Sequence, residues 1–313
     1  MEHFLGFALP GIPYGCTYAI VAVGLVLTYQ ATGVFNFAFG AQAYAAAFVF
    51  TVLTQNEHWS GFPAFLVSVV VMSPLVGLAF DRLLFRFIPN SNSTAKVVCG
   101  LSLLVGLPSL MTVIFGSLNL DATATIFPFF NPNVVYWTIF QTPINGIYLS
   151  TISVTVVVLV ALTALLRYTN LGLQMRGAVE SPRLVQLDGV NAEGVVAGAW
   201  VISSFMAGLA GVLLAPIYGA IQSQNYATLM VAAIAAAAWG LMRSIPIATG
   251  VAVLIGVVST VCQGYLPTGG LLFSAVLPGL PFFVLVAALL LLPGMRTLDQ
   301  NRDPLATVDP PPL

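Results

Sequence analysis

Hydrophobic residues run along this chain in long stretches separated by short breaks that are polar or rich in Pro and Gly. A membrane span needs about 20 apolar residues, and backbone groups in lipid must be satisfied within the segment, so stretches of this length predict helices. We place them at residues 12–30, 36–54, 62–80, 97–116, 146–166, 195–220, 226–242, 245–263 and 276–292. The pattern predicts an all-α, polytopic integral membrane protein with about nine transmembrane helices, within a range of about 8 to 10.

Composition supports the same class of protein. Hydrophobic residues make up 59% of the chain and charged residues 6%, whereas soluble domains carry about 25% charged residues. The net charge of −1 gives no reason to expect nucleic acid as a partner. We expect a transmembrane domain over residues 1–298 and a polar, Pro-rich, disordered tail over residues 299–313.

The basic residues predict the orientation. If residues 171–194 lie in the cytoplasm, the predicted spans place all 9 Lys and Arg residues on the cytoplasmic side. The external polar loops then carry Glu57, His58 and Asp121 instead. This asymmetry follows the positive-inside rule and predicts a cytoplasmic C-terminus. With nine spans the N-terminus would be external.

Residues 171–194 form a stretch that the membrane cannot hold. Five charged residues fall within it: Arg176, Glu180, Arg183, Asp188 and Glu193. Charged side chains are costly inside a bilayer. The stretch is therefore expected to lie in water between two spanning helices.

The same stretch carries signals for a short helix of its own. Ser181 suits the N-cap position and Pro182 the first helical position. Gly189 suits the left-handed position that ends a helix, and Leu184 and Leu187 share one face. We expect a short amphipathic helix on the membrane surface whose apolar face needs a partner.

Two groups of polar residues lie near spans. Asn36 and Gln42 stand close to Gly33 and Gly40 at the start of an apolar stretch. Such a group marks either a broken helix that lines a polar path or an interfacial helix cap. A later group consists of Ser203, Ser204, Gln222, Gln224 and Asn225, which would line a vestibule or form an external loop. We take Asn36, Gln42, Ser203 and Ser204 as candidates for a translocation path.

Small residues recur at intervals of four in the span at 195–220: Ala199, Ser203, Ala207, Gly211 and Ala215. This spacing lets two helix backbones approach closely in lipid. We expect Ala199, Ala207 and Gly211 to pack helices together.

Several absences argue against an enzyme. The only lysine, Lys96, is not part of a G-x-x-x-x-G-K-[ST] sequence, so the chain has no phosphate-binding loop of this type. The only histidines, His3 and His58, are predicted at or outside the external surface, and the cysteines lie in apolar stretches. A catalytic triad or a metal site is therefore not expected. We predict neither a catalytic residue nor a cofactor in this chain.

The external loop at 117–145 is rich in aromatic residues: Phe127, Phe129, Phe130, Tyr136, Trp137 and Phe140. Aromatic side chains gather where a membrane meets water. The loop is either such an aromatic belt or a docking surface for an external partner.

An ordered set of short motifs resembles one known family. The set comprises Gly15-x-x-Tyr18-Ala19, Asn36-Phe37-Ala38-x-Gly40, Arg176-x-x-x-Glu180 with Gly189-Val190-Asn191, Ala207-Gly208-x-Ala210-Gly211, and the stretch from Gly240 to Pro246. It is similar to the LivH/LivM family, the inner-membrane permease subunits of branched-chain amino acid ABC importers, and more to its LivH branch. Matching residues occur from about 11 to 292.

The resemblance implies a multi-pass permease of the bacterial inner membrane that imports branched-chain or related hydrophobic amino acids. It implies two ABC ATPase subunits that hold ATP and Mg, a second permease subunit (LivM-like or a second copy) and an external substrate-binding protein. In the family, the loop corresponding to 176–191 docks on the ATPase. Its candidate contact residues here are Arg176, Glu180, Arg183, Leu184, Leu187, Gly189 and Val190.

The chain departs from the family pattern at Phe39, where many relatives carry His, at Ser181-Pro182, and at Val185. The first departure bears on the substrate and the others on the ATPase partner. Related permeases carry urea or short amides, which leaves that substrate class open. Two other classes also remain: a carrier or channel that works without an ATPase, and a membrane enzyme, which the missing nucleophile–base pairs disfavour.

Overall fold

A computed structural model of the chain describes residues 2–32, 36–84, 93–115, 134–139, 142–170, 172–175, 192–267 and 271–292. The first half of the chain forms α1 (Glu2–Ala8), α2 (Gly11–Thr32), α3 (Phe39–Gln55), α4 (Gly61–Phe65), the π-helix η1 (Leu66–Met72), α5 (Ser73–Leu83) and α6 (Ser93–Phe115). The second half forms β1 (Val135–Ile139), β2 (Thr142–Asn145), α7 (Gly146–Tyr168), α10 (Ala192–Tyr218), α11 (Ser223–Trp239), α12 (Ile245–Tyr265) and α13 (Leu271–Leu291).

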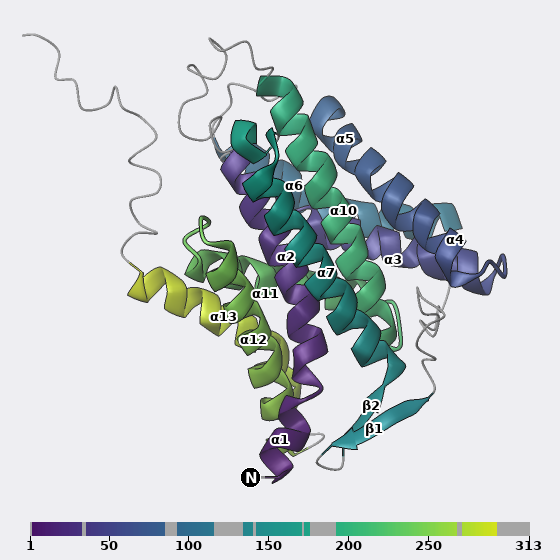
Figure 1. Ribbon diagram of the computed structural model, residues 1–313, viewed down its shortest axis with the longest axis vertical. Helices are drawn as coiled ribbons and strands as arrows, with labels where there is room; N and C mark the ends of the chain where they lie inside the picture. The colour runs from purple at the N-terminus through teal and green to yellow at the C-terminus, as the bar shows by residue number, and fades with distance from the viewer. Residues whose placement is uncertain are drawn as a thin grey trace, which may run out of the picture.

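Each of the nine predicted spans overlaps a helix or a continuous run of helices, as Figure 1 shows. The predicted all-helical, polytopic fold is confirmed, and within the described residues 6 helices are long and apolar enough to cross a membrane. The helices α3 and α11 have 17 residues each, which is fewer than the about 20 that a perpendicular span needs. The run Val154–Val160, which is rich in β-branched residues, lies within α7.

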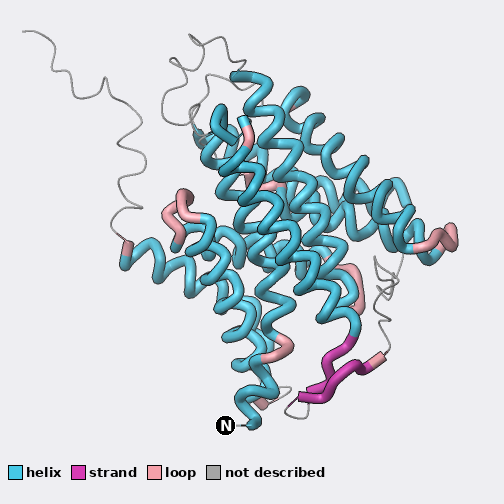
Figure 2. The backbone as a smooth tube through the Cα atoms, viewed as in Figure 1, coloured by secondary structure: helices cyan, strands magenta, loops and turns pink. Residues whose placement is uncertain are grey.

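A β-hairpin occupies part of the stretch that we expected to be only a loop. The strands β1 and β2 pair antiparallel, with Trp137 opposite Ile144 (Figure 2). Pro143 argues against a central strand in sequence. In a two-stranded sheet, however, both strands are edges, so its missing N–H is tolerated. The hydroxyl of Thr142 donates to Gly6 O at 2.7 Å and ties the hairpin to α1.

The third predicted span is a helix that a π-helical turn interrupts. Pro74, in the first turn of α5, cannot donate a backbone hydrogen bond and crowds the preceding turn. The wider π-helix η1 precedes it. The Ser73 hydroxyl donates to Ser68 O at 2.9 Å, five residues back, and so satisfies one carbonyl group of that turn. Such π-bulges are frequently found at functional sites.

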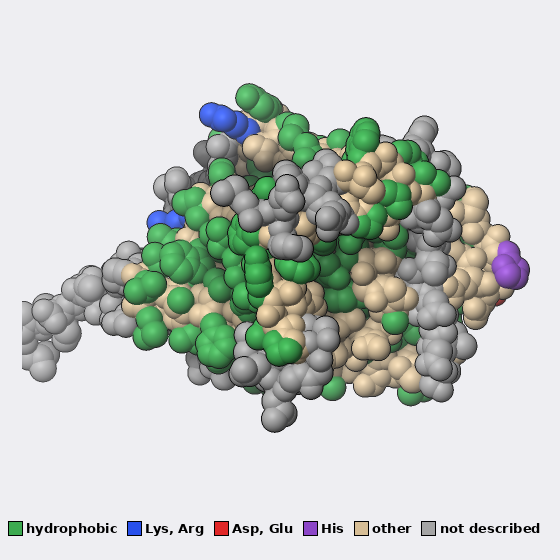
Figure 3. Space-filling model, turned by 90° about the horizontal axis from the view of Figure 1, so that it is seen from below, with side chains coloured by type: hydrophobic (Ala, Val, Ile, Leu, Met, Phe, Trp, Pro, Cys, Tyr) green, Lys and Arg blue, Asp and Glu red, His purple; other side chains and the backbone are tan. Residues whose placement is uncertain are grey.

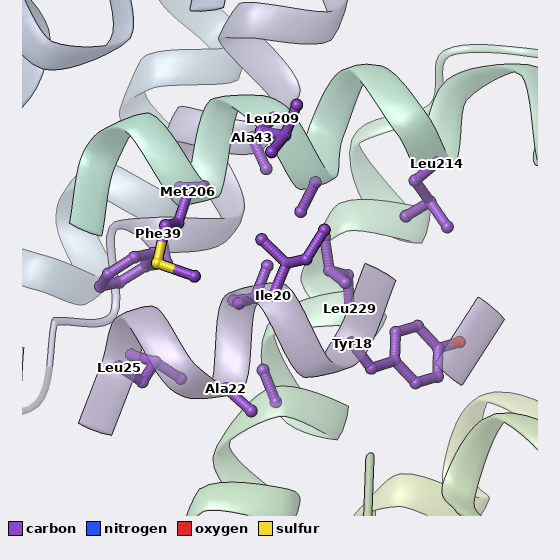
Figure 4. Packing of buried hydrophobic residues seen from close by; sticks show 14 of the residues in the cluster. Tyr18, Ile20, Ala22, Leu25, Phe39, Ala43, Met206, Leu209, Leu214 and Leu229 are labelled. Carbon is purple, nitrogen blue, oxygen red and sulfur yellow. The ribbon is translucent and has the colours of Figure 1, made fainter. Parts of the chain in front are cut away.

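The helices divide into a central and a peripheral set. The span Phe4–Ala31 includes nearly all of α2, and 89% of the residues in its most apolar stretch are buried. In the most apolar stretch of α6 only 11% of the residues are buried. The helix α2 lies between the side formed by α7 and α10 and the side formed by α11 to α13, and it contacts α12, α10, α11 and α7 (Figure 1). Figure 4 shows this core, where Ile20 of α2 lies among residues of α10 and α11.

The surface outside this core is mostly apolar, as a membrane protein requires. Charged side chains are sparse on the face that Figure 3 shows. Large apolar side chains are exposed along α6, where Val105 is 70% and Val113 81% exposed. These peripheral helices therefore present side chains suited to contact with lipid or with another apolar helix.

Glycine residues bring the backbones of α2 and α12 into direct contact. A Cβ added to Gly256 would lie 2.5 Å from Gly11 O and from Gly15 Cα. One added to Gly15 would lie 2.5 Å from Val253 Cα. No real Cβ fits at such distances, so any side chain here would separate the helices. This small-residue contact is the usual means of packing helices in lipid.

We expect the Gly256→Val substitution to separate α2 from α12 and to lower the free energy of unfolding by about 1–3 kcal/mol, because the atoms it would meet are backbone atoms that cannot move aside. Unfolding in mixed micelles would measure this. The matched control is Gly250→Val on the same helix, where an added Cβ meets nothing within 4 Å. Equal stability of the two variants would contradict the proposed contact.

Candidate functional site

The helix α3 begins in the middle of the bundle. A Cβ added to Gly40, in its first turn, would lie 3.0 Å from Leu104 Cδ1, halfway along α6. A Cβ added to Gly24, in the second half of α2, would lie 3.1 Å from the Phe39 ring and 3.5 Å from Met206, midway along α10. Figure 4 shows Phe39 and Met206 side by side. The first turn of α3 is thus surrounded by other helices. It lies away from the ends of α2, α6 and α10 and beside the first turn of α11, where a Cβ added to Gly40 would lie 2.7 Å from Tyr226 O.

Asn36 lies at this start and is only 2% exposed. Its Oδ1 accepts a hydrogen bond from the Ala38 N–H at 3.0 Å. Its Nδ2 is buried and has no hydrogen-bond partner. Ala38, the N-cap residue of α3, has no side chain that could cap the helix. A buried amide group without a partner is costly, so this end of α3 is a candidate for function.

Gln42 and Ser204, which are 162 residues apart in sequence, meet between α3 and α10. The Ser204 hydroxyl donates to Gln42 Oε1 at 3.3 Å, and both side chains are buried. Gln42 Nε2 is buried and has no partner. Ser203 is also buried, but its hydroxyl donates to Trp200 O at 3.0 Å within its own helix. The structure therefore brings together Gln42 and Ser204 of the four candidate path residues.

Sequence reasoning missed that α5 packs against α10 beside the contact between Gln42 and Ser204. A Cβ added to Gly77 would lie 2.6 Å from Ser204 Cβ and 2.9 Å from Trp200 O, so α5 lies against α10 here. One added to Gly208 would lie 2.8 Å from Ser73 Cβ. The available signal was a pair of small residues, Ser73 and Gly77, four positions apart in an apolar stretch.

The small residues predicted to pack helices lie on buried positions of α10. Ala199 and Ala207 are completely buried. A Cβ added to Gly211 would lie 2.6 Å from the backbone C of Ala43, so α10 and α3 touch through their backbones. The helix that carries Ser204 is therefore held directly against the helix that carries Gln42.

The predicted ATPase-contact residues Arg176, Glu180, Arg183, Leu184, Leu187, Gly189 and Val190 lie outside the described residues. The two ends of their segment are described. Met175, just before it, is 3% exposed, and a Cβ added to Gly198 of α10 would lie 3.7 Å from its Cε. Met175 therefore lies beside the first turns of α10.

A turn between α11 and α12 lies within the stretch from Gly240 to Pro246. Leu241 and Met242 both have positive φ angles, 50° and 54°, which are unfavourable for residues other than glycine. The Gln30 side-chain amide of α2 donates to Met242 O at 3.3 Å and Arg243 O at 3.1 Å. Met242 is completely buried. These contacts hold the unfavourable turn in place, and sequence reasoning did not single out Gln30.

The described part of the chain contains no cluster of His, Cys, Asp and Glu that could hold a metal ion. The free polar atoms of the candidate site are amide donors, Asn36 Nδ2 and Gln42 Nε2. This arrangement can bind an acceptor group and change partners as helices move. It offers no nucleophile and base in the described residues that would suit catalysis.

Comparison with known proteins identifies the family to which the chain is similar. The sequence model of a family described as the permease component of branched-chain amino acid transport systems matches residues 8–292. The high-affinity branched-chain amino acid permease protein LivH of Escherichia coli is 26% identical over 278 residues, which cover 85% of this chain and 88% of that protein. BraD of Pseudomonas aeruginosa is 27% identical over 269 residues, 82% of this chain and 85% of that protein.

A further relative is the probable LivH of Methanocaldococcus jannaschii, 26% identical over 303 residues, which cover 93% of this chain and 92% of that protein. Among solved structures, PsaBC from Streptococcus pneumoniae in complex with Fab matches with a TM-score of 0.52 and 13% identity, over 96% of this chain and 95% of that one. At this identity the likeness shows the fold alone.

We expect Gln42 and Ser204 to be coupled energetically. In a double-mutant cycle of Gln42→Leu and Ser204→Ala, the double variant should be more stable than the sum of the single effects by about 0.5–2 kcal/mol, because each single change leaves a buried polar atom alone. Unfolding in mixed micelles measures this. The control cycle pairs Gln42→Leu with Thr51→Val, on the same helix. Additive effects in the first cycle would contradict the coupling.

Proposed function

The chain belongs to the family of permease components of branched-chain amino acid transport systems, and from this we propose that it forms half of the translocation path of an ATP-driven importer for branched-chain or related hydrophobic amino acids. The match of the family sequence model over residues 8–292 carries the proposal. A permease component of an ABC transport system is not catalytic, since ATP is hydrolysed on a separate subunit. The substrate rests on relatives that are 26–27% identical.

The proposed path runs beside the start of α3. The buried side chains of Asn36, Gln42 and Ser204 lie there, within a bundle whose other interior side chains are mainly apolar. An unpaired donor in such surroundings gains free energy when it meets a substrate acceptor. This arrangement supports the role in the path proposed for Asn36, Gln42 and Ser204. The role of Ser203 rests on its position next to Ser204 in the sequence.

The proposed coupling mechanism uses α10. The ATPase subunits would dock on the 176–191 loop through Arg176, Glu180, Arg183, Leu184, Leu187, Gly189 and Val190. The loop joins α10 directly, and α10 touches α3 at Ala43. A push on the loop would shift α10 against α3 and α5 and break or remake the Ser204–Gln42 contact. Access could then alternate between the two sides, provided the ATPase binds the two states with different affinity.

The proposed cellular location follows from the family, and the proposed orientation follows from the positions of the arginine residues. A multi-pass membrane protein of this kind would reside in the bacterial inner membrane with a cytoplasmic C-terminus. Arg82 at the end of α5, Arg167 at the end of α7 and Arg243 after α11 lie at one end of the bundle, the end where α10 begins. That grouping supports the predicted orientation. We propose no cofactor in this chain, with ATP and Mg held by the partner ATPase.

The proposed partners are the ATPase subunits, a second permease subunit and an external substrate-binding protein. In proteoliposomes, the complete complex with ATP should accumulate leucine, isoleucine and valine, and this chain alone should accumulate none. Uptake by the chain alone would identify an independent carrier or channel. Inhibition of uptake by urea or acetamide, with no effect of leucine, would identify the alternative substrate class. Labelled-substrate uptake measures each case.

We expect the Leu187→Asp substitution to abolish the stimulation of ATP hydrolysis by substrate-loaded binding protein, because a buried carboxylate would prevent an apolar helix face from docking on the ATPase. Steady-state hydrolysis by the reconstituted complex measures this. Leu83→Asp is the control, since Leu83 is 67% exposed at the end of α5 and lies outside the loop. Unchanged stimulation in the Leu187→Asp complex would exclude the docking role.

A further inference from the structure

We infer that the N-terminal end of α3, together with the side-chain amide of Asn36, binds the α-carboxylate of the transported amino acid. The inference rests on the proposed function, because it assigns the site for one end of the proposed substrate. It starts from two independent observations: a helix that begins in the middle of the bundle, and a buried amide donor without a partner at that same point.

The Asn36 amide group is hydrogen-bonded to the start of α3. Its Oδ1 accepts from the Ala38 N–H at 3.0 Å, so the amide group lies against the N-cap residue of α3. A backbone N–H needs an acceptor, which identifies the other end of the amide as Nδ2. Asn36 is 2% exposed and its Nδ2 has no partner. The free N–H₂ group is therefore presented at the helix end.

The helix itself adds further donors at this point. The N–H groups of the first turn of any helix have no acceptor within that helix. In α3 the first such bond among the described residues runs from Gln42 N to Ala38 O, and no side chain caps the turn. The aligned peptide dipoles of the 17-residue helix also place partial positive charge here. Helix N-termini inside membranes bind anionic substrate groups for these reasons.

The chemistry of the site selects an anion. The unpaired groups are all donors: Asn36 Nδ2, the first-turn N–H groups and, one turn further along, Gln42 Nε2. In the described part of the chain, no Asp, Glu, Lys or Arg lies in the middle of a spanning helix. An ammonium group would find no free acceptor in this set, whereas a carboxylate offers two oxygens to it. A carboxylate held by donors in a low dielectric is bound strongly.

The surroundings suit the other end of a branched-chain amino acid. At Gly40 the first turn of α3 packs directly against α11, where an added Cβ would lie 2.7 Å from Tyr226 O, and the apolar side chains of Leu104 in α6 and Met230 in α11 lie beside it. Phe39 and Met206 lie together on the side facing α2. A few directed polar groups within apolar walls are typical of small-molecule sites. In the conformation shown the site is closed, so substrate would enter when α10 moves relative to α3.

A purely structural role for Asn36 is the competing explanation. Asparagine often bonds to the backbone two residues ahead in a turn, as Asn36 does here. That role uses only Oδ1 and leaves the buried Nδ2 unsatisfied. Asn36→Asp separates the two explanations, because it retains an oxygen acceptor for the Ala38 N–H and replaces the donor with an anionic oxygen. A structural role would survive this change, and carboxylate binding would not.

The test measures binding of leucine to the membrane complex, reconstituted in nanodiscs with its ATPase and permease partners and without the binding protein. Leucine and leucinamide, whose carboxylate is replaced by a neutral amide, compete against labelled leucine. We expect the wild type to prefer leucine by about tenfold or more, since a charge-assisted hydrogen bond accounts for a factor of that size. The Asn36→Asp complex should bind leucine at least about tenfold more weakly and show no such preference.

The matched control is Thr51→Val on the same helix. Thr51 is 1% exposed and donates only to Ala47 O within α3, so this variant should keep the wild-type affinity and preference. Equal binding of leucine and leucinamide by the wild type, or no saturable leucine binding, would overturn the inference even if the Asn36→Asp complex failed to assemble. Wild-type affinity in the Asn36→Asp complex would overturn it as well.

ATP-driven uptake by the wild-type complex distinguishes a failure of the proposed function from a failure of the α3 site. If the complete complex accumulates no branched-chain amino acid, the proposed function itself fails. If uptake occurs and the carboxylate makes no difference to binding, the function stands and the assignment of the α3 site is wrong.

Discussion

Lipid cannot satisfy backbone polar groups and gives apolar helices no hydrophobic reason to associate. The chain therefore depends on contacts in which two helix backbones touch through residues without large side chains. Gly15 and Gly256 join α2 to α12, and Gly211 joins α10 to Ala43 of α3. These contacts place α2, α3 and α10 at the centre, and the peripheral helices pack around them.

The same close packing creates the polar interior. Because α10 meets α3 and α5 at backbone distance, even a short side chain such as that of Ser204 reaches Gln42 across the interface. The π-helical turn before Ser73 fits α5 into this arrangement, and the Ser73 hydroxyl donates to Ser68 O within that turn. A movement of α10 therefore acts directly on the few buried polar groups beside the start of α3.

Much of the fold was predictable because the membrane imposes a simple rule on length and polarity. All nine predicted spans correspond to helices, and the β-branched run in α7 is helical since a lone strand in lipid would leave its backbone unsatisfied. The hairpin was missed because Pro143 argues against a strand. This objection does not hold here, since both strands of a two-stranded sheet are edge strands. The π-helix was missed because a wider turn has no distinct periodicity within an apolar stretch.

The sequence by itself determined where the long apolar helices lie and to which family the motifs point. It also named Asn36, Gln42 and Ser204 as polar residues worth attention. Only the tertiary structure decided that Gln42 and Ser204 meet, that Ser73 and Gly77 lie beside them, and that α3 begins in mid-bundle. The physical reason is that helices apolar on all sides carry no stripe that marks the inward face, so the packing of small residues sets which faces meet.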